Sequence, residues 1–266
     1  MRWVASDLDG TIVRRDGTMS HRTVAALAAC EQAGVRVAFV TGRPARWLAP
    51  VVAATGHRGL AVCANGAVVY DLARERVVST RGIELAVARR IVAAVRRAAP
   101  GGHFAVESLG GFRREPRYRP HRGDVPEEPS PVADLLAGAD VILKILYRLE
   151  GAGADDILAA VRPALEGLAE PVHSNADDCL LEISALGVSK ASTLAELVAA
   201  DGLGPQDVVA FGDMPNDVPM LRWAGTGYAM ADGHPEAIAA ADHVAPPCAE
   251  DGVAQVLEAL LQRAAG

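Results

Sequence analysis

The chain has 266 residues, half of them apolar, and a formal net charge of −7 at pH 7. This length suits one large α/β unit or two smaller domains, and the apolar fraction excludes a chain that is disordered throughout. The acidic balance argues against a dedicated nucleic-acid-binding protein, which normally carries a basic surplus.

The first third of the sequence alternates between apolar strands and helical patterns. Ser20 is a candidate N-cap for the first helix, and Gly34 stands where that helix would end. Pro44 is placed to begin the second helix, which Pro50 would kink or shorten. This alternation is typical of a parallel sheet covered by helices. The predicted strands are 3–5 and 35–40, and the predicted helices are 21–33 and 45–55.

The middle of the chain has a different pattern. The dipeptide Asn65-Gly66, between two apolar runs, predicts a β-hairpin over residues 59–71. The segment 84–187 combines helical patterns and strand candidates with an Arg- and Pro-rich stretch over 112–131, which indicates a separate α+β unit. The predicted strands of this part are 75–80, 141–149 and 179–184, and the predicted helices are 84–99 and 155–168.

The alternation of the first third returns near the C-terminus, with helices predicted over 189–201, 215–224 and 253–264 and a strand over 207–213. We therefore predict an α/β fold with a Rossmann-like parallel-sheet core and an inserted smaller α+β domain. The core would consist of residues 1–83 and 188–266, and the inserted domain of residues 84–187.

Polar residues follow three of the predicted core strands. Because ligands of open α/β sheets bind outside the carboxyl ends of strands, we expect these side chains to meet at one edge of the sheet. Lys190, near the start of a helix, can project a cation toward the same edge. The residues after the strands are Asp7, Asp9, Thr41, Gly42, Arg43, Asp213, Asn216 and Asp217.

Each of these signals also has a purely structural interpretation when taken alone. The D-x-D-G sequence at Asp7 and Asp9 is a common turn, Thr41 could simply cap a helix, and an isolated lysine usually lies in solvent. Together, however, they form the set that metal-assisted phosphoryl transfer needs. Mg²⁺ takes carboxylate and carbonyl oxygens, an ionised Asp can attack phosphorus, and a second Asp can move the proton. Thr and Lys donors can hold the remaining phosphoryl oxygens.

Four motifs in this order, DLDGT, VTGR, GVSKASTL and GDMPND, resemble those of the haloacid dehalogenase superfamily of phosphohydrolases. CANGAVVYD, LEISALGVSK and the C-terminal segment are similar to its Cof-like branch, which carries an α/β cap between the second and third motifs. The resemblance implies an Mg²⁺-dependent phosphatase of small phosphorylated metabolites, such as sugar phosphates, that forms an aspartyl phosphate.

The resemblance also assigns roles to individual residues. Asp7 would be the nucleophile and Asp9 the general acid/base. Thr41, Gly42, Lys190 and Asn216 would bind phosphate. The metal would be held by Asp7, Asp213 and the backbone carbonyl of Asp9, with Asp217 beyond the direct ligands or orienting Lys190.

Possible substrate contacts lie outside these motifs. Arg43 and Asn65 are candidates in the core, although Asn65 is a hairpin residue first. In the inserted domain a few basic side chains could grip the leaving group, while a solvated basic loop is the simpler expectation. The candidates there are Arg113, Arg114, Arg117, Tyr118, Arg119, His121 and Arg122.

Three other functions fit parts of this pattern. A phosphotransferase or phosphomutase could use the same aspartyl phosphate. A D-x-D glycosyltransferase would leave Lys190 and GDMPND without roles, and a non-catalytic phospho-binding protein would not need the complete set of acid, metal and phosphate residues.

The four cysteines lie far apart without a C-x-x-C pair, which favours reduced thiols. The sequence has no signal-peptide or transmembrane pattern. We therefore expect a cytoplasmic protein, a monomer or homodimer, that binds no membrane.

Overall fold

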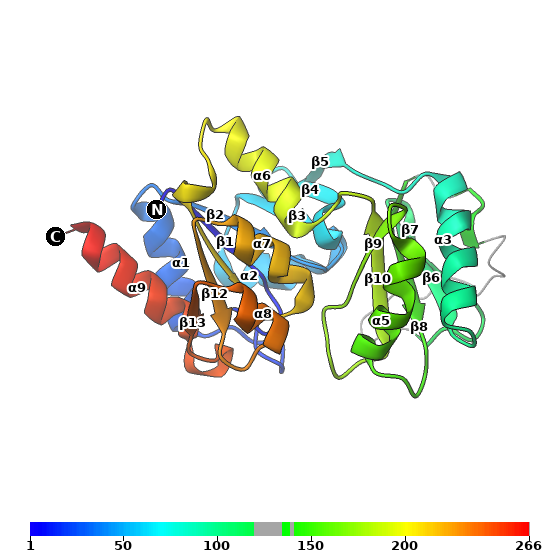
Figure 1. Cartoon of the computed structure of the whole chain (residues 1–266). Coiled ribbons are helices and arrows are strands. Elements are labelled where there is room, and N and C mark those ends of the chain that lie inside the picture. Colours follow the sequence, from blue (N-terminus) through cyan, green and yellow to red (C-terminus); the bar gives the residue numbers. More distant parts are fainter. Residues whose placement is uncertain (120–134, 139–140, 266) are drawn as a thin grey trace. The chain divides into compact units, whose positions relative to one another are not determined.

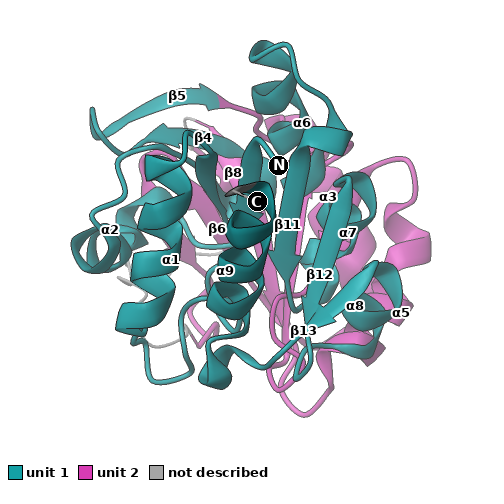
Figure 2. Cartoon of the chain, turned by 90° about the vertical axis from the view of Figure 1, so that its left-hand side faces the viewer, with its two compact units in different colours: residues 1–79, 190–266 teal, residues 80–189 magenta. Residues whose placement is uncertain are grey.

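A computed structural model describes residues 1–119, 135–138 and 141–265. The chain forms two compact units, which we call the core unit (residues 1–79 and 190–266) and the inserted unit (residues 80–189) (Figure 2). The boundaries predicted from the sequence lie at 83/84 and 187/188. The first differs because Ile83 is already tied to the inserted unit, where its backbone N–H donates to the carbonyl of Ile142 at 2.7 Å.

An eight-stranded sheet forms the centre of the core unit, in the order β13-β12-β11-β1-β2-β3-β4-β5 (Figure 1). The strands from β13 to β3 are parallel, and β4 runs antiparallel to β3. β1 lies at the point where the chain order reverses, because β2 continues on one side of it and β11 lies on the other. The strands are β1 (Trp3–Ser6), β2 (Arg36–Val40), β3 (Leu60–Cys63), β4 (Val68–Asp71), β5 (Arg76–Thr80), β11 (Val208–Gly212), β12 (Thr226–Met230) and β13 (His243–Ala245).

Helices cover this sheet, as the alternation of the sequence predicts. α6, α7 and α8 pack through one cluster of buried apolar side chains that includes Trp3 and Ala210 from the sheet, while α1 contacts α9 and β2. Ser20 caps α1, since its hydroxyl accepts the backbone N–H of Thr23. The helices are α1 (His21–Gln32), α2 (Ala49–Thr55), α6 (Lys190–Ala200), α7 (Val218–Trp223), α8 (Pro235–Ala240) and α9 (Gly252–Ala265).

The inserted unit is an antiparallel sheet with the helices α3 and α5 packed against it. Its five strands have the order β7-β6-β8-β10-β9. α3 and α5 contact each other and share an apolar cluster with residues of β6, β8 and β10, such as Phe104, Ile145 and Leu181. The elements are α3 (Leu85–Ala98), β6 (His103–Ser108), β7 (Gly111–Arg114), β8 (Ile142–Arg148), α5 (Ala154–Leu165), β9 (Ala169–Val172) and β10 (Leu180–Ala185).

The predicted fold class, a parallel α/β core with a smaller α+β unit, is confirmed. Several local predictions were wrong. The helix predicted over 45–55 does not run through the whole segment: a 3₁₀ turn (Ala45–Trp47) precedes α2, which is shortened as expected and has Pro50 in its first turn. The helix predicted over 215–224 likewise divides into a 3₁₀ turn (Pro215–Asp217) and α7.

Other strands were not predicted at all. β6 and β7 form a hairpin around Leu109-Gly110, so Phe112–Arg114 belong to a strand rather than to an irregular loop. β9, β12, β13 and the short helix α8 were also missed. All four cysteines are free thiols, as expected. In the part of the chain that the structure describes, no helix is both long and apolar enough to cross a membrane.

Candidate active site

The carboxyl end of β1 places Asp7 at the centre of the site. The backbone N–H of Asp7 donates to the carbonyl of Phe211 on β11 at 3.0 Å, which continues the pairing of the two strands. The Asp7 side chain is buried, whereas 55% of the Asp9 side chain is exposed, two residues further along. Asp7 therefore lies at the switch point of the sheet, where ligands of open α/β folds bind.

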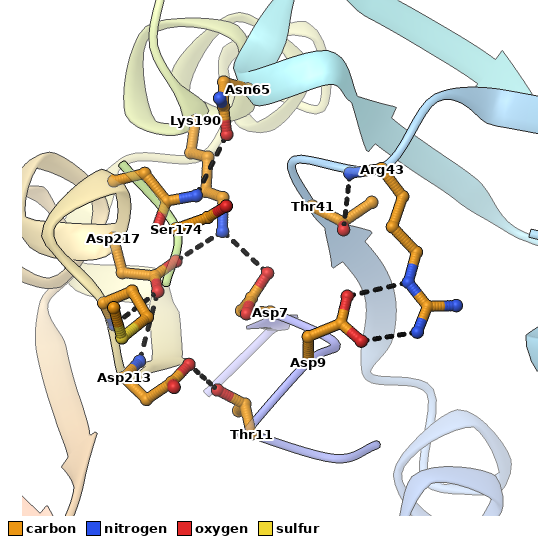
Figure 3. Close-up of polar contacts among 12 residues, drawn as sticks. Asp7, Asp9, Thr11, Thr41, Arg43, Asn65, Ser174, Lys190, Asp213 and Asp217 are labelled. Atoms are coloured by element: carbon orange, nitrogen blue, oxygen red, sulfur yellow. Dashed lines mark hydrogen bonds and ion pairs between the residues drawn. The ribbon is translucent and has the colours of Figure 1, made fainter. Parts of the chain in front are cut away.

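Lys190, the first residue of α6, joins two carboxylates in this buried region. Its Nζ donates to Asp7 Oδ1 at 2.6 Å and to Asp217 Oδ1 at 2.7 Å (Figure 3). Burial alone would lower the pKa of Lys190, but the charges and hydrogen bonds of Asp217 and Asp7 outweigh burial and raise it. Lys190 therefore remains an ammonium group at neutral pH.

The Asp217 carboxylate accepts hydrogen bonds at both of its oxygens and so holds neighbouring groups in place. Its Oδ2 accepts the backbone N–H groups of Asp213 and Met214 at 3.1 and 3.0 Å, while Oδ1 accepts from Lys190. Both carboxylate oxygens are thus used, and the loop after β11 is fixed by a fully buried anion. The family resemblance left two roles open for Asp217, and this geometry favours the role of orienting Lys190.

Asp213 presents its carboxylate beside Asp7. One oxygen, Oδ1, accepts the hydroxyl of Thr11 at 3.0 Å. Gly10 makes room for this carboxylate, because a Cβ on Gly10 would overlap Asp213 Oδ2, and its φ of +79° also favours glycine. Carboxylate oxygens of Asp7, Asp213 and Asp217 lie within 4.8 Å of one another.

The crowding of these acids changes their protonation. Burial, and then the charges of Asp217 and Asp9, raise the pKa of Asp7 to about 7 despite the opposing effect of Lys190. Burial and the neighbouring carboxylates of Asp7 and Asp217 also raise the pKa of Asp213 well above its usual value. One ammonium does not compensate for three buried carboxylates, so the cluster fits a further cation. A set of oxygen donors suits a hard ion such as Mg²⁺.

A second polar group connects the ends of β1 and β2. The guanidinium of Arg43 donates to both oxygens of Asp9, at 2.7 Å from Nε and 2.5 Å from Nη2 (Figure 3). The Thr41 hydroxyl accepts the backbone N–H of Arg43 at 3.0 Å, which leaves its own proton available for a ligand. The sequence did not predict that Arg43 binds Asp9. The bidentate contact orients the Asp9 carboxylate.

Two buried amides form a third contact of the site. Asn216 Nδ2 donates to Asn65 Oδ1 at 3.0 Å, and Asn216 Oδ1 has no hydrogen-bond partner among the described residues. Asn65 has a left-handed backbone, with φ of 56°. β3 and β4 form the predicted β-hairpin, and its loop contains a 3₁₀ turn (Ala64–Gly66). The Thr193 hydroxyl holds this loop by donating to the carbonyl of Gly66 at 2.7 Å. Asn65 therefore supports Asn216.

The structure thus brings Asp7, Lys190, Asp213 and Asp217 into one hydrogen-bonded network and pairs Asp9 with Arg43. Gly10 and Thr11 belong to the DLDGT motif, but the sequence predicted no role for either residue. Their signal was the spacing from Asp7, which puts both in the turn directly after the strand.

The candidate contacts in the inserted unit have varied environments. Tyr118 is buried against Phe112, so it contributes to packing. Arg113 and Arg114 donate to the carbonyls of Ala137 and Tyr118. Of the remaining candidates, Arg117 and Arg119 are exposed, and His121 and Arg122 lie outside the described residues.

Comparison with known proteins agrees with this geometry. A family model described as haloacid dehalogenase-like hydrolase matches residues 4–257. The chain is 25% identical over 261 residues to the 5-amino-6-(5-phospho-D-ribitylamino)uracil phosphatase YcsE of Bacillus subtilis, covering 97% of this chain and 94% of that protein. It is 27% identical over 278 residues to the pyridoxal phosphate phosphatase YbhA of Escherichia coli, covering 96% and 97%.

Solved structures share the whole fold. The sugar phosphatase BT4131, of subclass IIB, superposes with a TM-score of 0.79 at 20% identity, and the match covers 98% of this chain and 99% of that one. At this level of identity the match establishes the architecture of both units.

Proposed function

The chain belongs to the haloacid dehalogenase-like hydrolase family, and from this membership we propose that it is an Mg²⁺-dependent phosphatase that works through an aspartyl phosphate on Asp7. The observation that carries the proposal is the environment of Asp7, a buried carboxylate at the end of β1 with the Lys190 ammonium on Oδ1 at 2.6 Å. Because Lys190 holds only one of the two oxygens, Asp7 Oδ2 is the atom we assign as the nucleophile.

The residues present fit a magnesium ion. Asp213 has an oxygen to spare, since Thr11 takes the other, and Gly10 leaves the space beside Asp213 Oδ2 open. Asp7 would offer Oδ1 to the ion, because a carboxylate oxygen that accepts from Lys190 still has a second lone pair. The family resemblance adds the carbonyl of Asp9. When bound, the ion supplies positive charge that keeps the acids ionised and polarises a phosphoryl oxygen.

Two displacements at phosphorus complete the reaction. In the first, Asp7 Oδ2 attacks phosphorus while the bond to the leaving oxygen breaks, and Asp9 donates a proton to that oxygen, giving the free alcohol and an aspartyl phosphate. In the second, Asp9 removes a proton from water, whose oxygen attacks the same phosphorus and releases inorganic phosphate and the Asp7 carboxylate. Asp9 thereby returns to its starting protonation state. Its exposure gives it access to both the leaving group and water.

We assign four groups to hold the transferred phosphoryl oxygens. The Lys190 ammonium and the Thr41 hydroxyl are donors, and we assign the backbone N–H of Gly42 and the amide of Asn216 the same task. Arg43 would then position Asp9 rather than bind substrate, because its guanidinium is already engaged by that carboxylate. These donors stabilise charge that shifts during transfer.

We propose small phosphorylated metabolites as the substrates. The two phosphatases named above act on phosphomonoesters of small heterocyclic compounds, and BT4131 is a sugar phosphatase. A panel should therefore contain sugar phosphates, pyridoxal phosphate and polyol phosphates.

The test is phosphate release from that panel with and without Mg²⁺, for the wild type and for Asp7→Asn. This substitution nearly preserves the shape of the side chain while removing the nucleophile, so we expect folded protein without turnover. Asp156→Asn, an exposed position on α5, is the charge-matched control and should remain active. Turnover that persists in Asp7→Asn or is indifferent to Mg²⁺ would overturn the mechanism.

A further inference from the structure

A cleft of about 350 Å³ lies in the core unit, at the amino ends of three parallel strands. Trp3, Arg36 and Leu60, the first residues of β1, β2 and β3, line it. Asp7 follows the carboxyl end of β1, so the cleft and the candidate active site lie at opposite ends of the same strand. Its volume is at the lower end of the range of small-molecule sites, and the proposed phosphatase reaction uses none of its residues.

The cleft is lined by a histidine whose ring is only half paired. The His57 side chain is 4% exposed, and its Nδ1 lies 2.8 Å from Glu31 Oε1. Because an ionised carboxylate only accepts, Nδ1 carries the proton, and in the neutral ring Nε2 is then an acceptor. Nε2 is buried and has no hydrogen-bond partner among the described residues. Buried polar atoms are seldom left unpaired, so a donor from outside the chain would complete this ring.

The ring is held in place from two sides. Its centroid lies 4.5 Å from that of Phe39, and a Cβ on Gly59 would lie 2.6 Å from its Cε1 and 2.8 Å from its Nε2. Glycine at this position therefore makes room for the Nε2 side of the ring, and Gly59 lines the cleft as well. Both His57 and Gly59 belong to the loop between α2 and β3, so a small displacement of that loop brings Nε2 to a bound molecule.

The cleft carries charges of both signs. The side chains of Glu31 and Arg36 are 43% and 59% exposed. Arg36 Nη1 lies 3.0 Å from Asp201 Oδ2 and the guanidinium stacks on the Trp3 ring, which leaves its other N–H groups for a ligand. Glu31 would repel an anion and Arg36 a cation. The set therefore favours a neutral ligand that both donates and accepts hydrogen bonds.

We propose that this cleft binds a small neutral polyhydroxy compound, a sugar or a sugar alcohol, at a site separate from the active site. A hydroxyl group both donates and accepts, so one hydroxyl can donate to His57 Nε2 while another accepts from Arg36. The side chains of Val35 and Val37 supply apolar surface for the C–H groups of the ligand. A few polar groups on an apolar wall are typical of small-molecule sites.

Nitrogen NMR of the histidine rings tests the contact with His57. In protein labelled with ¹⁵N in its histidine side chains, adding glucose or ribitol should shift the Nε2 signal of His57. His57→Gln, which removes the imidazole, identifies that signal. A His57 signal that moves with neither compound would overturn the proposal.

Titration calorimetry separates the cleft from the active site. Arg36→Gln should weaken binding of the same compound about fivefold, the usual effect of losing one hydrogen bond, and keep phosphatase activity. Arg22→Gln is the matched control, because Arg22 is also an exposed arginine paired with an acid of the core unit, and it should change neither.

The charge of the probe gives a second test. Gluconate and glucosamine, the anionic and cationic counterparts of glucose, should bind more weakly than glucose. Binding that Arg36→Gln leaves unchanged, or that inorganic phosphate abolishes, would place the sugar at the active site. Either result would overturn the proposal without touching the proposed activity, which the Asp7→Asn assay tests independently.

Discussion

Replacing Lys190 by methionine isolates the charge at the centre of the site. Methionine is also unbranched and of similar length, so the change removes the ammonium group while filling most of the same space. Lys190 is fully buried and donates to Asp7 at 2.6 Å and to Asp217 at 2.7 Å. The variant therefore leaves two buried carboxylates without their cation.

The expected cost in metal-free buffer at pH 8 is about 3–5 kcal/mol in the free energy of unfolding, the usual cost of breaking a buried ion pair from one side. Asp217 keeps the two backbone N–H groups of Asp213 and Met214 on its second oxygen, so part of its stabilisation remains. Lys190→Met with Asp217→Asn should consequently be more stable than Lys190→Met alone, because the second change removes the uncompensated charge.

The raised pKa values of the buried acids determine how the cost of Lys190→Met changes with pH. The pKa of Asp7 is raised to about 7 in the folded protein, mainly by burial, and that of Asp213 is also raised. A carboxyl group with a higher pKa in the folded state binds its proton more tightly there, so it favours folding increasingly as pH falls from about 7. Without Lys190 these pKa values rise further. The cost of Lys190→Met should therefore be smaller at pH 5.5 than at pH 8.

Tryptophan fluorescence during urea unfolding is the assay. All three tryptophans, Trp3, Trp47 and Trp223, lie in the core unit and report on the unit that contains Lys190. Arg22→Met is the control, since Arg22 forms an exposed ion pair with Glu258 in the same unit and should cost at most about 1 kcal/mol. If Lys190→Met lowers the free energy of unfolding no more than Arg22→Met does, the ammonium of Lys190 does not stabilise the buried carboxylates as argued. An equal cost at both pH values would assign the loss to packing.

Three further predictions concern other parts of the site. In metal-free buffer Asp7→Asn should raise the Tm above that of the wild type, by an amount that grows from pH 5.5 to pH 8, because ionising Asp7 costs folding free energy; a constant difference would contradict its raised pKa. Asn65→Ala and Asn216→Ala should each lower kcat/KM. Because the two side chains share one hydrogen bond, the loss of transition-state stabilisation in the double variant should be about 1 kcal/mol smaller than the sum of the two single losses. Strictly additive losses would refute this coupling. Gly10→Ala should cost about 1–3 kcal/mol in urea unfolding and raise the Mg²⁺ concentration needed for half-maximal activity, because the added methyl group overlaps Asp213; unchanged values of both would show that the loop relaxes freely.

Elements with strong local patterns were predictable from the sequence. α1 has an N-cap at Ser20 and a glycine after its end. In β2 the residues after Arg36 form an apolar run, as β11 does, because both faces of a parallel central strand are buried. β13 is the edge strand and β12 lies beside it, and several residues of both strands are only partly buried, so their apolar patterns are weak. Their existence depends on pairing with β11, which is a tertiary effect.

The site was predictable as a set of residues but not as a set of contacts. Strand ends in a parallel sheet meet at one edge, which is why Asp7 and Asp213 could be placed together from order alone. The bond between Arg43 and Asp9 joins two loops 34 residues apart, and that between Asn216 and Asn65 spans 151 residues. These contacts depend on loop backbones such as the left-handed turn at Asn65, for which Asn-Gly is compatible with several geometries.

In the proposed mechanism, the buried acids would link metal binding, protonation and phosphate binding in one region. Three carboxylates, of Asp7, Asp213 and Asp217, lie together with one ammonium, and fully ionised they leave two negative charges away from water. Protons can neutralise them, which is what the raised pKa values of Asp7 and Asp213 express. A divalent cation can do so without protonating Asp7, and an unprotonated Asp7 is the only form that can attack phosphorus. We therefore expect protons to compete with Mg²⁺ at this site, so that the ion required for charge balance also keeps the nucleophile ionised.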